Sequence, residues 1–166
     1  MLSLEFKDAI WSGDSAKSAG HDVEIVSLRD KEIKFCIGCL SCQKTQRCFM
    51  HDDTDIIRKK MLHSNVLVFV TPIYYYEMSG ALKTLLDRAN SLYSSDYRFR
   101  AIYALLTAAE DEDHVPQKAF SGIEGWIDCF EKAHLTGTLF CDGVSDPDDI
   151  KGNEKLQRAY DMGRSI

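Results

Sequence analysis

Hydrophobic and polar positions along the chain fall into blocks that predict helices and strands in turn. Residues 65–70 and 101–106 are almost wholly apolar, which is typical of strands that helices cover on both faces. Other blocks repeat apolar residues at helical spacing. The predicted strands are 23–28, 65–70, 101–106 and 135–141. The predicted helices are 2–19, one opening at Asp52 and Asp53, one after residue 79, one opening at Pro116, and 153–164.

This alternation predicts an α/β fold with a mostly parallel sheet between two layers of helices. No repeat or low-complexity stretch divides the chain, so we expect a single domain over residues 1–166. Such sheets bind their ligands beyond the carboxyl ends of the strands. We therefore expect chemistry in the loops 29–51, 71–79, 107–115 and 142–152.

Composition narrows the classes of function. Hydrophobic residues make up 45% and charged residues 28% of the chain, which is typical of a folded globular protein. The net charge of −6 argues against nucleic acid as the main partner. Apolar runs such as 66–70 are too short to span a bilayer, and no signal peptide opens the chain. We expect no membrane partner and a cytoplasmic location.

Four of the six cysteines crowd one predicted loop, in the pattern Cys36-x2-Cys39-x2-Cys42-x5-Cys48. Thiolates are soft ligands, so this pattern favours an iron–sulfur cluster or zinc, with four ordinary thiols as the alternative. The tight spacing of the first three favours iron–sulfur. The other two cysteines, at positions 129 and 141, lie in apolar surroundings and are expected to be buried.

A second segment, residues 71–80, follows a predicted buried strand and precedes a helix. It carries three adjacent tyrosines, Tyr74 to Tyr76, whose faces suit stacking against a planar ring. Ser79 can cap the helix, and Gly80 allows close backbone approach. A tyrosine-rich interface patch is the alternative interpretation.

In its order of motifs the chain resembles the flavodoxin-like NAD(P)H-dependent FMN oxidoreductases and, within them, the iron–sulfur flavoproteins. Each motif is modest alone, and their order and spacing carry the resemblance. The matching stretches are Ala19 to Glu24, the four cysteines with Asp52 and Asp53, Thr71 to Tyr75, Met78 to Gly80, Leu82, Lys83, Asp87, Arg88, and the tail from Gly143 to Ile166.

The resemblance implies a flavodoxin-like fold, bound FMN, electrons taken from NADH or NADPH, and a small electron acceptor. In the iron–sulfur branch it also implies a [4Fe–4S] cluster on the four cysteines, near the flavin. The flavin does the chemistry, so no side chain is expected to be catalytic. Homodimers or homotetramers are common in such families. The implied cofactor-binding residues are Thr71, Pro72, Ile73, Tyr74, Tyr75, Met78, Ser79, Gly80, Thr107, Ala108, Ala109 and Glu110.

The family pattern begins with a buried strand and a phosphate-binding loop, and neither precedes the predicted helix 2–19. In the strand order 2-1-3-4-5 the first strand lies between the strands matching 23–28 and 65–70. We expect a truncated start. Recruitment of residues 1–6 as a strand, or a strand from a partner chain, are the alternatives. Two other functions stay open: a flavin-free form that acts through protein contacts, and a zinc-stabilised module.

Overall fold

The computed structural model describes residues 13–146 and 149–166. Its sheet has three parallel strands, β1 (Val66–Tyr74), β3 (Ala101–Thr107) and β4 (His134–Cys141). A short strand, β2 (Glu77–Met78), turns back antiparallel onto the end of β1, so the strand order is β2-β1-β3-β4. The predicted mostly parallel sheet is therefore confirmed.

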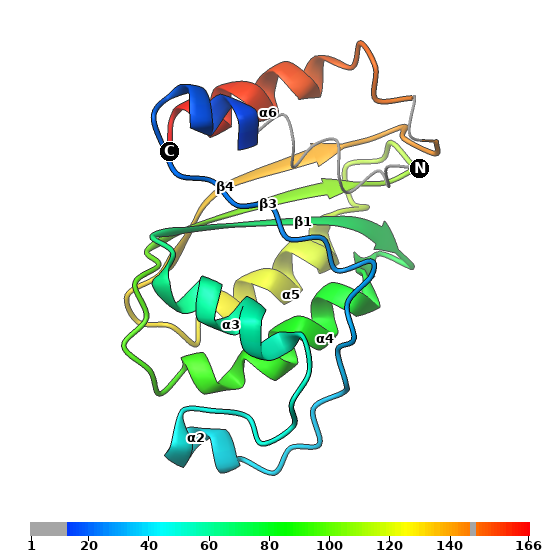
Figure 1. Ribbon diagram of the computed structural model, residues 1–166. Coiled ribbons are helices and arrows are strands. Elements are labelled where there is room, and N and C mark those ends of the chain that lie inside the picture. Colours follow the sequence, from blue (N-terminus) through cyan, green and yellow to red (C-terminus); the bar gives the residue numbers. More distant parts are fainter. Residues whose placement is uncertain (1–12, 147–148) are drawn as a thin grey trace.

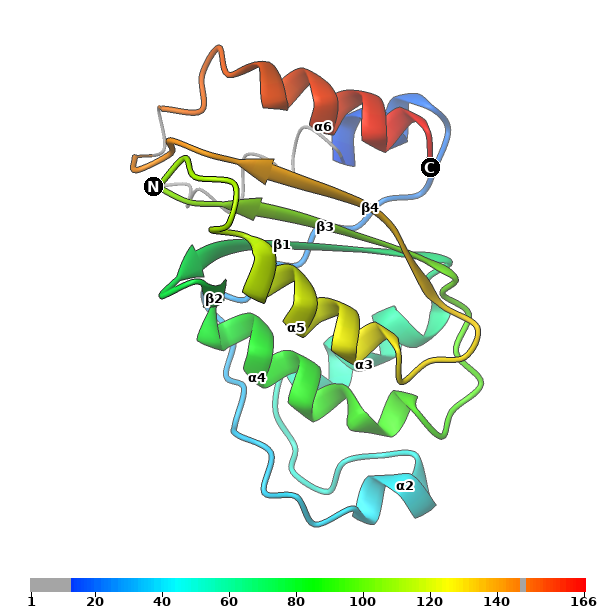
Figure 2. The same cartoon turned by 180° about the vertical axis from the view of Figure 1, so that it is seen from behind.

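Helices cover both faces of this sheet. The helices α3 (Thr54–His63), α4 (Gly80–Arg88) and α5 (Gln117–Ile127) lie on one face. The helix α6 (Glu154–Arg164) and helical residues 13–18 lie on the other (Figures 1 and 2). A 3-10 turn, η1 (Ala89–Leu92), continues α4, and a short helix, α2 (Ser41–Thr45), lies far from the sheet. This is the predicted three-layer arrangement.

The strand β3 is the centre of the core because both of its faces are buried. Ile102, Ala104 and Leu106 pack toward α3, α4 and α5, whereas Tyr103 and Leu105 pack toward α6. This period of two follows from the pleat of a strand. Four aromatic rings pack together next to the first residues of β3: Phe99 is completely buried and contacts Tyr97, Trp126 and Phe130. Because β1 and β3 pair in parallel, their carboxyl ends lie side by side at one edge of the sheet.

The strand β1 differs from its prediction in two ways. It runs on to Tyr74, so residues 71–74, which we predicted as loop, belong to the strand, and β2 was not predicted at all. Its faces are also unequal: Leu67 and Phe69 are buried, but Val68 is 38% exposed. On the face opposite α3, α4 and α5, the described helix α6 packs over β4.

The predicted strand 23–28 is wrong. Residues 21–27 have neither helix nor strand structure, although Val26 and Leu28 pack against the core. A strand requires a hydrogen-bonded neighbour, and among the described residues β1 has only β2 on that side, over two residues. The apolar pattern therefore found the buried side chains but not the backbone pairing.

Other predictions are confirmed or corrected more simply. The helix over 153–164, the helix after Pro116 and the helix with Asp53 at its start are confirmed. The loop 29–51 contains the unpredicted α2. The prediction that Cys129 is buried is wrong, because it lies on an exposed face near the end of α5, whereas Cys141 is buried as expected. The expectations for residues 1–12 lie outside the described residues.

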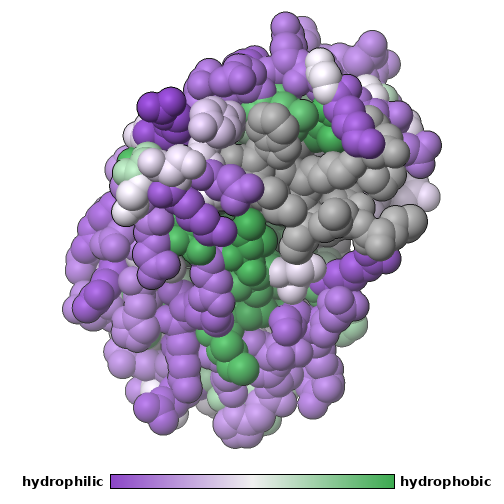
Figure 3. Space-filling view, turned by 45° about the horizontal axis from the view of Figure 1, so that its top comes forward, coloured by the Kyte–Doolittle hydropathy of each residue, from purple (hydrophilic) through white to green (hydrophobic). Residues whose placement is uncertain are grey.

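Figure 3 shows one face of the molecule, where the coloured residues are mostly hydrophilic, with hydrophobic residues in a strip that runs down from the middle and in a patch near the top. Among the described residues, no helix is both long and apolar enough to cross a membrane.

Candidate functional site

The turn after β1 presents aromatic rings at the carboxyl edge of the sheet. Tyr74 pairs with Glu77, which leaves Tyr75 and Tyr76 as a two-residue hairpin turn. Both have positive φ, 52° and 68°, a conformation that favours Asn and Gly over tyrosine. Tyr75 is 99% exposed, so no packing inside the chain compensates the strain. Strain of this kind is concentrated at ligand sites.

The segment from Thr71 to Gly80 is closed at its base by one hydrogen bond. The backbone N–H of Ser79 donates to the buried hydroxyl of Thr71, at 3.0 Å. Ser79 in turn caps α4, because its hydroxyl accepts from the N–H of Leu82 at 3.3 Å. Gly80 then begins the helix. Apart from its chain neighbours and the backbone of its own helix, no protein atom lies within 4 Å of the place where a Cβ at Gly80 would stand, so the space beside it is open.

The end of β3 lies beside this segment. Thr107 pairs with Pro72 in the register of the sheet, and its buried hydroxyl has no hydrogen-bond partner among the described residues. Of the three residues that follow, Ala108 is buried, whereas Ala109 and Glu110 are exposed. The resemblance implied cofactor-binding residues at the end of β1 and at the end of β3. Because these two strands pair in parallel, the residues at their ends are neighbours along one edge of the sheet.

Sequence reasoning missed a link between the turn and α5. The ring of Tyr76 stacks on His114, with 5.8 Å between centroids, and the ammonium of Lys118 lies 5.7 Å from the same ring. These contacts join the hairpin turn to the loop that follows β3. No spacing in the sequence indicates them, because they join residues that only the fold brings together.

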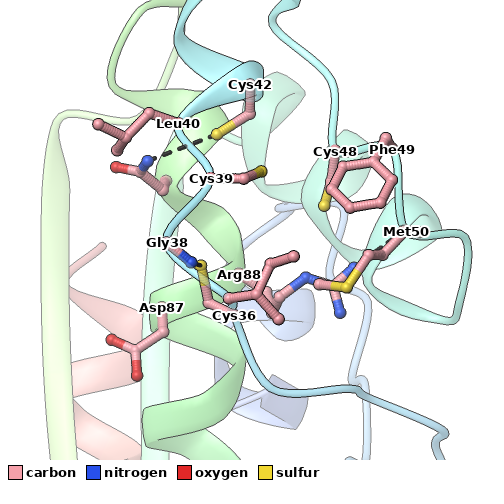
Figure 4. Close-up of a pocket in the computed structure, with 12 residues that line it drawn as sticks. Cys36, Gly38, Cys39, Leu40, Cys42, Cys48, Phe49, Met50, Asp87 and Arg88 are labelled. Carbon is pink, nitrogen blue, oxygen red and sulfur yellow. Dashed lines mark hydrogen bonds between the residues drawn. The ribbon is translucent and has the colours of Figure 1, made fainter.

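The four clustered cysteines line one hollow at the other end of α4. Figure 4 shows their side chains around it, together with Phe49, Met50 and Arg88. Cys36 and Cys39 are exposed, and Cys42 and Cys48 are half-buried. Within the described parts of the chain, no three His, Cys, Asp or Glu side chains are arranged around a single metal ion. The thiols surround a volume instead of converging on a point.

Each of the four sulfurs has a polar or charged neighbour. The N–H of Gly38 donates to Cys36 Sγ at 3.5 Å, and the amide of Asn90 donates to Cys42 Sγ at 3.4 Å. Hydrogen bonds from the backbone and hydroxyl of Ser41 lower the pKa of Cys39. Cys48 lies beside the guanidinium of Arg88. At Cys39 the surroundings therefore favour the thiolate over the thiol.

Arg88 and Asp52 form a buried ion pair beneath this hollow. The guanidinium donates to both carboxylate oxygens, at 2.6 and 3.2 Å, and the side chains are 1% and 0% exposed. Burial opposes ionisation of Asp52, but the hydrogen bonds from Arg88, from the backbone of Lys34 and from Thr54 together outweigh it and lower the pKa of Asp52 to about 2. Burial likewise opposes the charge of Arg88, but Asp52 and Cys48 raise its pKa above the ordinary value.

The two candidate sites lie at opposite ends of α4. Ser79 and Gly80 begin this helix beside the tyrosine turn, whereas Arg88 ends it beside the cysteines. The helical rise of 1.5 Å per residue puts Ser79 and Arg88 about 13 Å apart along the axis. One rigid element therefore sets the spacing of both sites.

The arrangement matches one protein family. The profile of the NADPH-dependent FMN reductase family matches residues 6–115, which include both candidate sites. The chain belongs to this family. The family match ends at residue 115, just before α5.

Curated relatives of this family carry names that fit the cysteine motif. An iron–sulfur flavoprotein of Archaeoglobus fulgidus is 37% identical over 87 residues, which cover 52% of this chain and 43% of the relative. Iron–sulfur flavoprotein MJ1083 of Methanocaldococcus jannaschii is 40% identical over 73 residues, which cover 44% and 38%. The matches thus span less than half the length of these relatives.

Solved structures with the same fold share little sequence. An NAD(P)H:quinone oxidoreductase from Methanothermobacter marburgensis has a TM-score of 0.72 at 17% identity, covering 98% of this chain and 88% of its own. An FMN-dependent NADH-azoreductase from Bacillus anthracis, in complex with FMN, has a TM-score of 0.61 at 16% identity, covering 98% and 89%. These likenesses show the flavodoxin-like fold.

We expect Asp52→Asn to lower the free energy of unfolding at pH 7 by about 3–5 kcal/mol, because it leaves the charge of Arg88 buried and unpaired. In the native chain the low pKa of Asp52 contributes up to about 2.6 kcal/mol, present in full above the unfolded pKa of about 3.9 and lost as the pH falls toward 2. Urea unfolding followed by circular dichroism at pH 7 and pH 3 measures both effects.

The control is Asp87→Asn, which removes the exposed partner of Lys83 on the same helix. It is expected to change the free energy of unfolding by less than about 0.5 kcal/mol at either pH. An Asp52→Asn chain as stable as the native chain at pH 7 would contradict the role given to the buried pair.

We expect Tyr75→Asn to raise the free energy of unfolding by roughly 1 kcal/mol, because asparagine tolerates the left-handed conformation better and no packing is lost. Thermal unfolding measures the gain. Tyr93→Asn is the control, since Tyr93 is also exposed but has an ordinary φ of −53°. A similar gain in both variants, or a loss in Tyr75→Asn, would refute strain at the turn.

Proposed function

We propose that this protein binds FMN beside the segment Thr71–Gly80 and transfers electrons from NADH or NADPH to a small acceptor. The observation that carries the proposal is the strained, exposed tyrosine turn at the carboxyl edge of the sheet. It stands directly before the capped start of α4, in a chain of the FMN reductase family. Bound FMN supplies exchange of electron pairs with nicotinamides and of single electrons with metal centres.

The residues at this edge suit a flat, anionic ligand. The rings of Tyr74 and Tyr75 are exposed and offer faces for stacking. The start of α4 has backbone N–H groups without helical acceptors, and it carries the positive end of the helix dipole. The unpartnered hydroxyl of Thr107 is a further polar group at this edge. We propose that these groups orient the ring system and leave one of its faces open to the nicotinamide.

The open space at Gly80 supports the same proposal. Within the protein nothing requires a glycine there, since an added Cβ would meet no atom within 4 Å. A ligand lying against the backbone would explain the absence of a side chain. The remaining implied residues belong to the same proposal: Pro72, Ile73 and Met78 lie within the segment Thr71–Gly80, and Ala108, Ala109 and Glu110 directly follow Thr107 in the sequence.

We further propose that Cys36, Cys39, Cys42 and Cys48 hold a [4Fe–4S] cluster. Such a cluster takes one thiolate at each iron, so its ligands surround a volume, as the four sulfurs do around their hollow. Hydrogen bonds reach the sulfurs of Cys36 and Cys42, and those from Ser41 lower the pKa of Cys39, which favours its ligand form. Ile37, Leu40 and Phe49 line the same hollow and supply apolar surroundings.

We expect Gly80→Ala to weaken FMN binding roughly tenfold or more, because the new methyl group occupies the space proposed for the ligand. The free energy of unfolding is expected to stay the same or rise by up to about 1 kcal/mol, since alanine favours a helix. Flavin fluorescence during titration with FMN measures the affinity, and bleaching by NADH or NADPH measures reduction.

The matched control is Gly125→Ala on α5, where an added Cβ also meets open space. Gly125 lies near the carboxyl end of this helix, whereas Lys118, near its amino end, contacts the tyrosine turn. Its FMN affinity is expected to equal that of the native chain. Equal affinity in the two variants would move the ligand away from Gly80. A native chain that binds no FMN would favour the flavin-free form that acts through protein contacts.

We expect anaerobic reconstitution with ferrous iron and sulfide to load close to four irons per chain, the content of a [4Fe–4S] cluster. Cys39→Ser is expected to lose most of that iron, whereas Cys129→Ser, at an exposed cysteine outside the hollow, is expected to keep it. Iron and sulfide analysis with visible absorption spectra measures the loading. Equal iron in both variants, or zinc in place of iron in the native chain, would contradict the cluster.

A further inference from the structure

One side chain joins both ends of the cysteine loop, residues 35–49, to the body of the protein. Arg88 Nη1 donates to the carbonyl of Lys34 at 2.8 Å, just before the loop. Arg88 Nη2 donates to the carbonyl of Met50 at 2.9 Å, just after it. The two ends of the loop therefore meet at one guanidinium, which projects from the last turn of α4.

Asp52 completes this junction from the other side. Its carboxylate accepts from both nitrogens of Arg88 and also from the backbone N–H of Lys34, at 3.0 Å, and of Thr54, at 2.9 Å. Arg88 and Asp52 thus fasten the entry to the loop, the exit from the loop and the start of α3 in one network. A lysine has no planar fork with which to span these acceptors.

The burial of this pair indicates that its role is geometric. Both side chains are withdrawn from water, and such desolvation offsets much of the attraction between the charges. A pair of apolar residues would fill the same space at similar stability. Apolar residues could not, however, donate hydrogen bonds to the backbone carbonyls of Lys34 and Met50 at the two ends of the loop.

Arg88 also faces the interior of the loop. It lines the hollow with the four cysteines and lies beside Cys48. Its Nε–H is buried and has no hydrogen-bond partner among the described residues. A positive, incompletely bonded group therefore borders the space around which the sulfurs are arranged.

We propose that Arg88 is a positioning residue that preforms the cysteine loop for a negatively charged metal–sulfur cluster and favours reduction of that cluster through its charge. This inference rests on the cluster proposed above. It adds that the loop geometry is imposed from α4 before any iron is bound. The same helix that begins beside the tyrosine turn would then hold the cluster site in place.

Three variants separate geometry, charge and folding. Arg88→Lys keeps the charge but loses the fork. The double variant Arg88→Gln with Asp52→Asn removes both charges together, which avoids an unpaired buried ion and keeps the test open if the single variant fails to fold. Lys83→Met is the matched control, because it removes an exposed cation from the same helix without touching the loop.

The first measurement needs no cluster. Hydrogen exchange of the iron-free chain is expected to be at least about tenfold faster at the bonded amides of the loop, such as Gln43 and Gln46, in Arg88→Lys and in the double variant. Exchange in β3 and α5 is expected to stay unchanged, and Lys83→Met is expected to match the native chain throughout. Unchanged loop exchange in both Arg88 variants would overturn the proposal.

The second measurement uses reconstituted protein. Arg88→Lys and the double variant are expected to bind iron about tenfold or more weakly, at unchanged FMN content. The midpoint potential of any cluster that still forms is expected to shift to more negative values in the double variant but little in Arg88→Lys. The double variant loses the positive group that lines the hollow, whereas the negative charge lost with it, on Asp52, does not line the hollow. A purely structural role would lower the iron content without this difference in potential.

The outcomes distinguish the two proposals. A native chain that binds no iron refutes the cluster, and the exchange measurement still decides whether Arg88 orders the loop. If the native chain binds iron and both Arg88 variants equal it in iron content and in midpoint potential, the role of Arg88 is refuted and the cluster proposal is retained.

Discussion

The arrangement of α3, α4 and the cysteine loop depends on the buried ion pair of Arg88 and Asp52. It joins the end of α4, the start of α3 and both ends of the cysteine loop at one point. Two charges removed from water contribute little net stability, but removing one of them leaves the other buried and unpaired. The pair therefore acts as a geometric constraint whose partners cannot be lost singly.

The helix α4 carries this constraint to the rest of the protein. Its first residues stand at the carboxyl edge of the sheet, where the dipole favours anions, and its last turn carries Arg88, whose charge suits the negative end of the dipole. The parallel pairing of β1 with β3 places Thr107 beside Pro72 at the same edge. The two proposed cofactors would therefore be held by opposite ends of one short element, packed through Leu82, Leu85 and Leu86.

The tyrosine turn shows a different balance between stability and function. Tyr75 and Tyr76 occupy backbone positions that asparagine and glycine adopt at lower cost. Tyr76 recovers part of that cost through its contacts with His114 and Lys118, but Tyr75 touches almost nothing. Selection for stability alone would not keep tyrosine there, which supports the proposal that the turn binds a ligand.

The sequence by itself determined the elements whose evidence is local or repeats at a short period. The apolar runs within β1 and β3 and the Ser79 cap were predicted correctly, and the order of the motifs identified the family. Only the tertiary structure decided the features that need a distant partner. Residues 23–28 formed no strand because no neighbour within residues 13–146 and 149–166 pairs with them, and Arg88 met Asp52 across 36 positions of sequence. Hydrogen-bond pairing and charge burial depend on which segments the fold brings together, and periodicity along the chain does not contain that information.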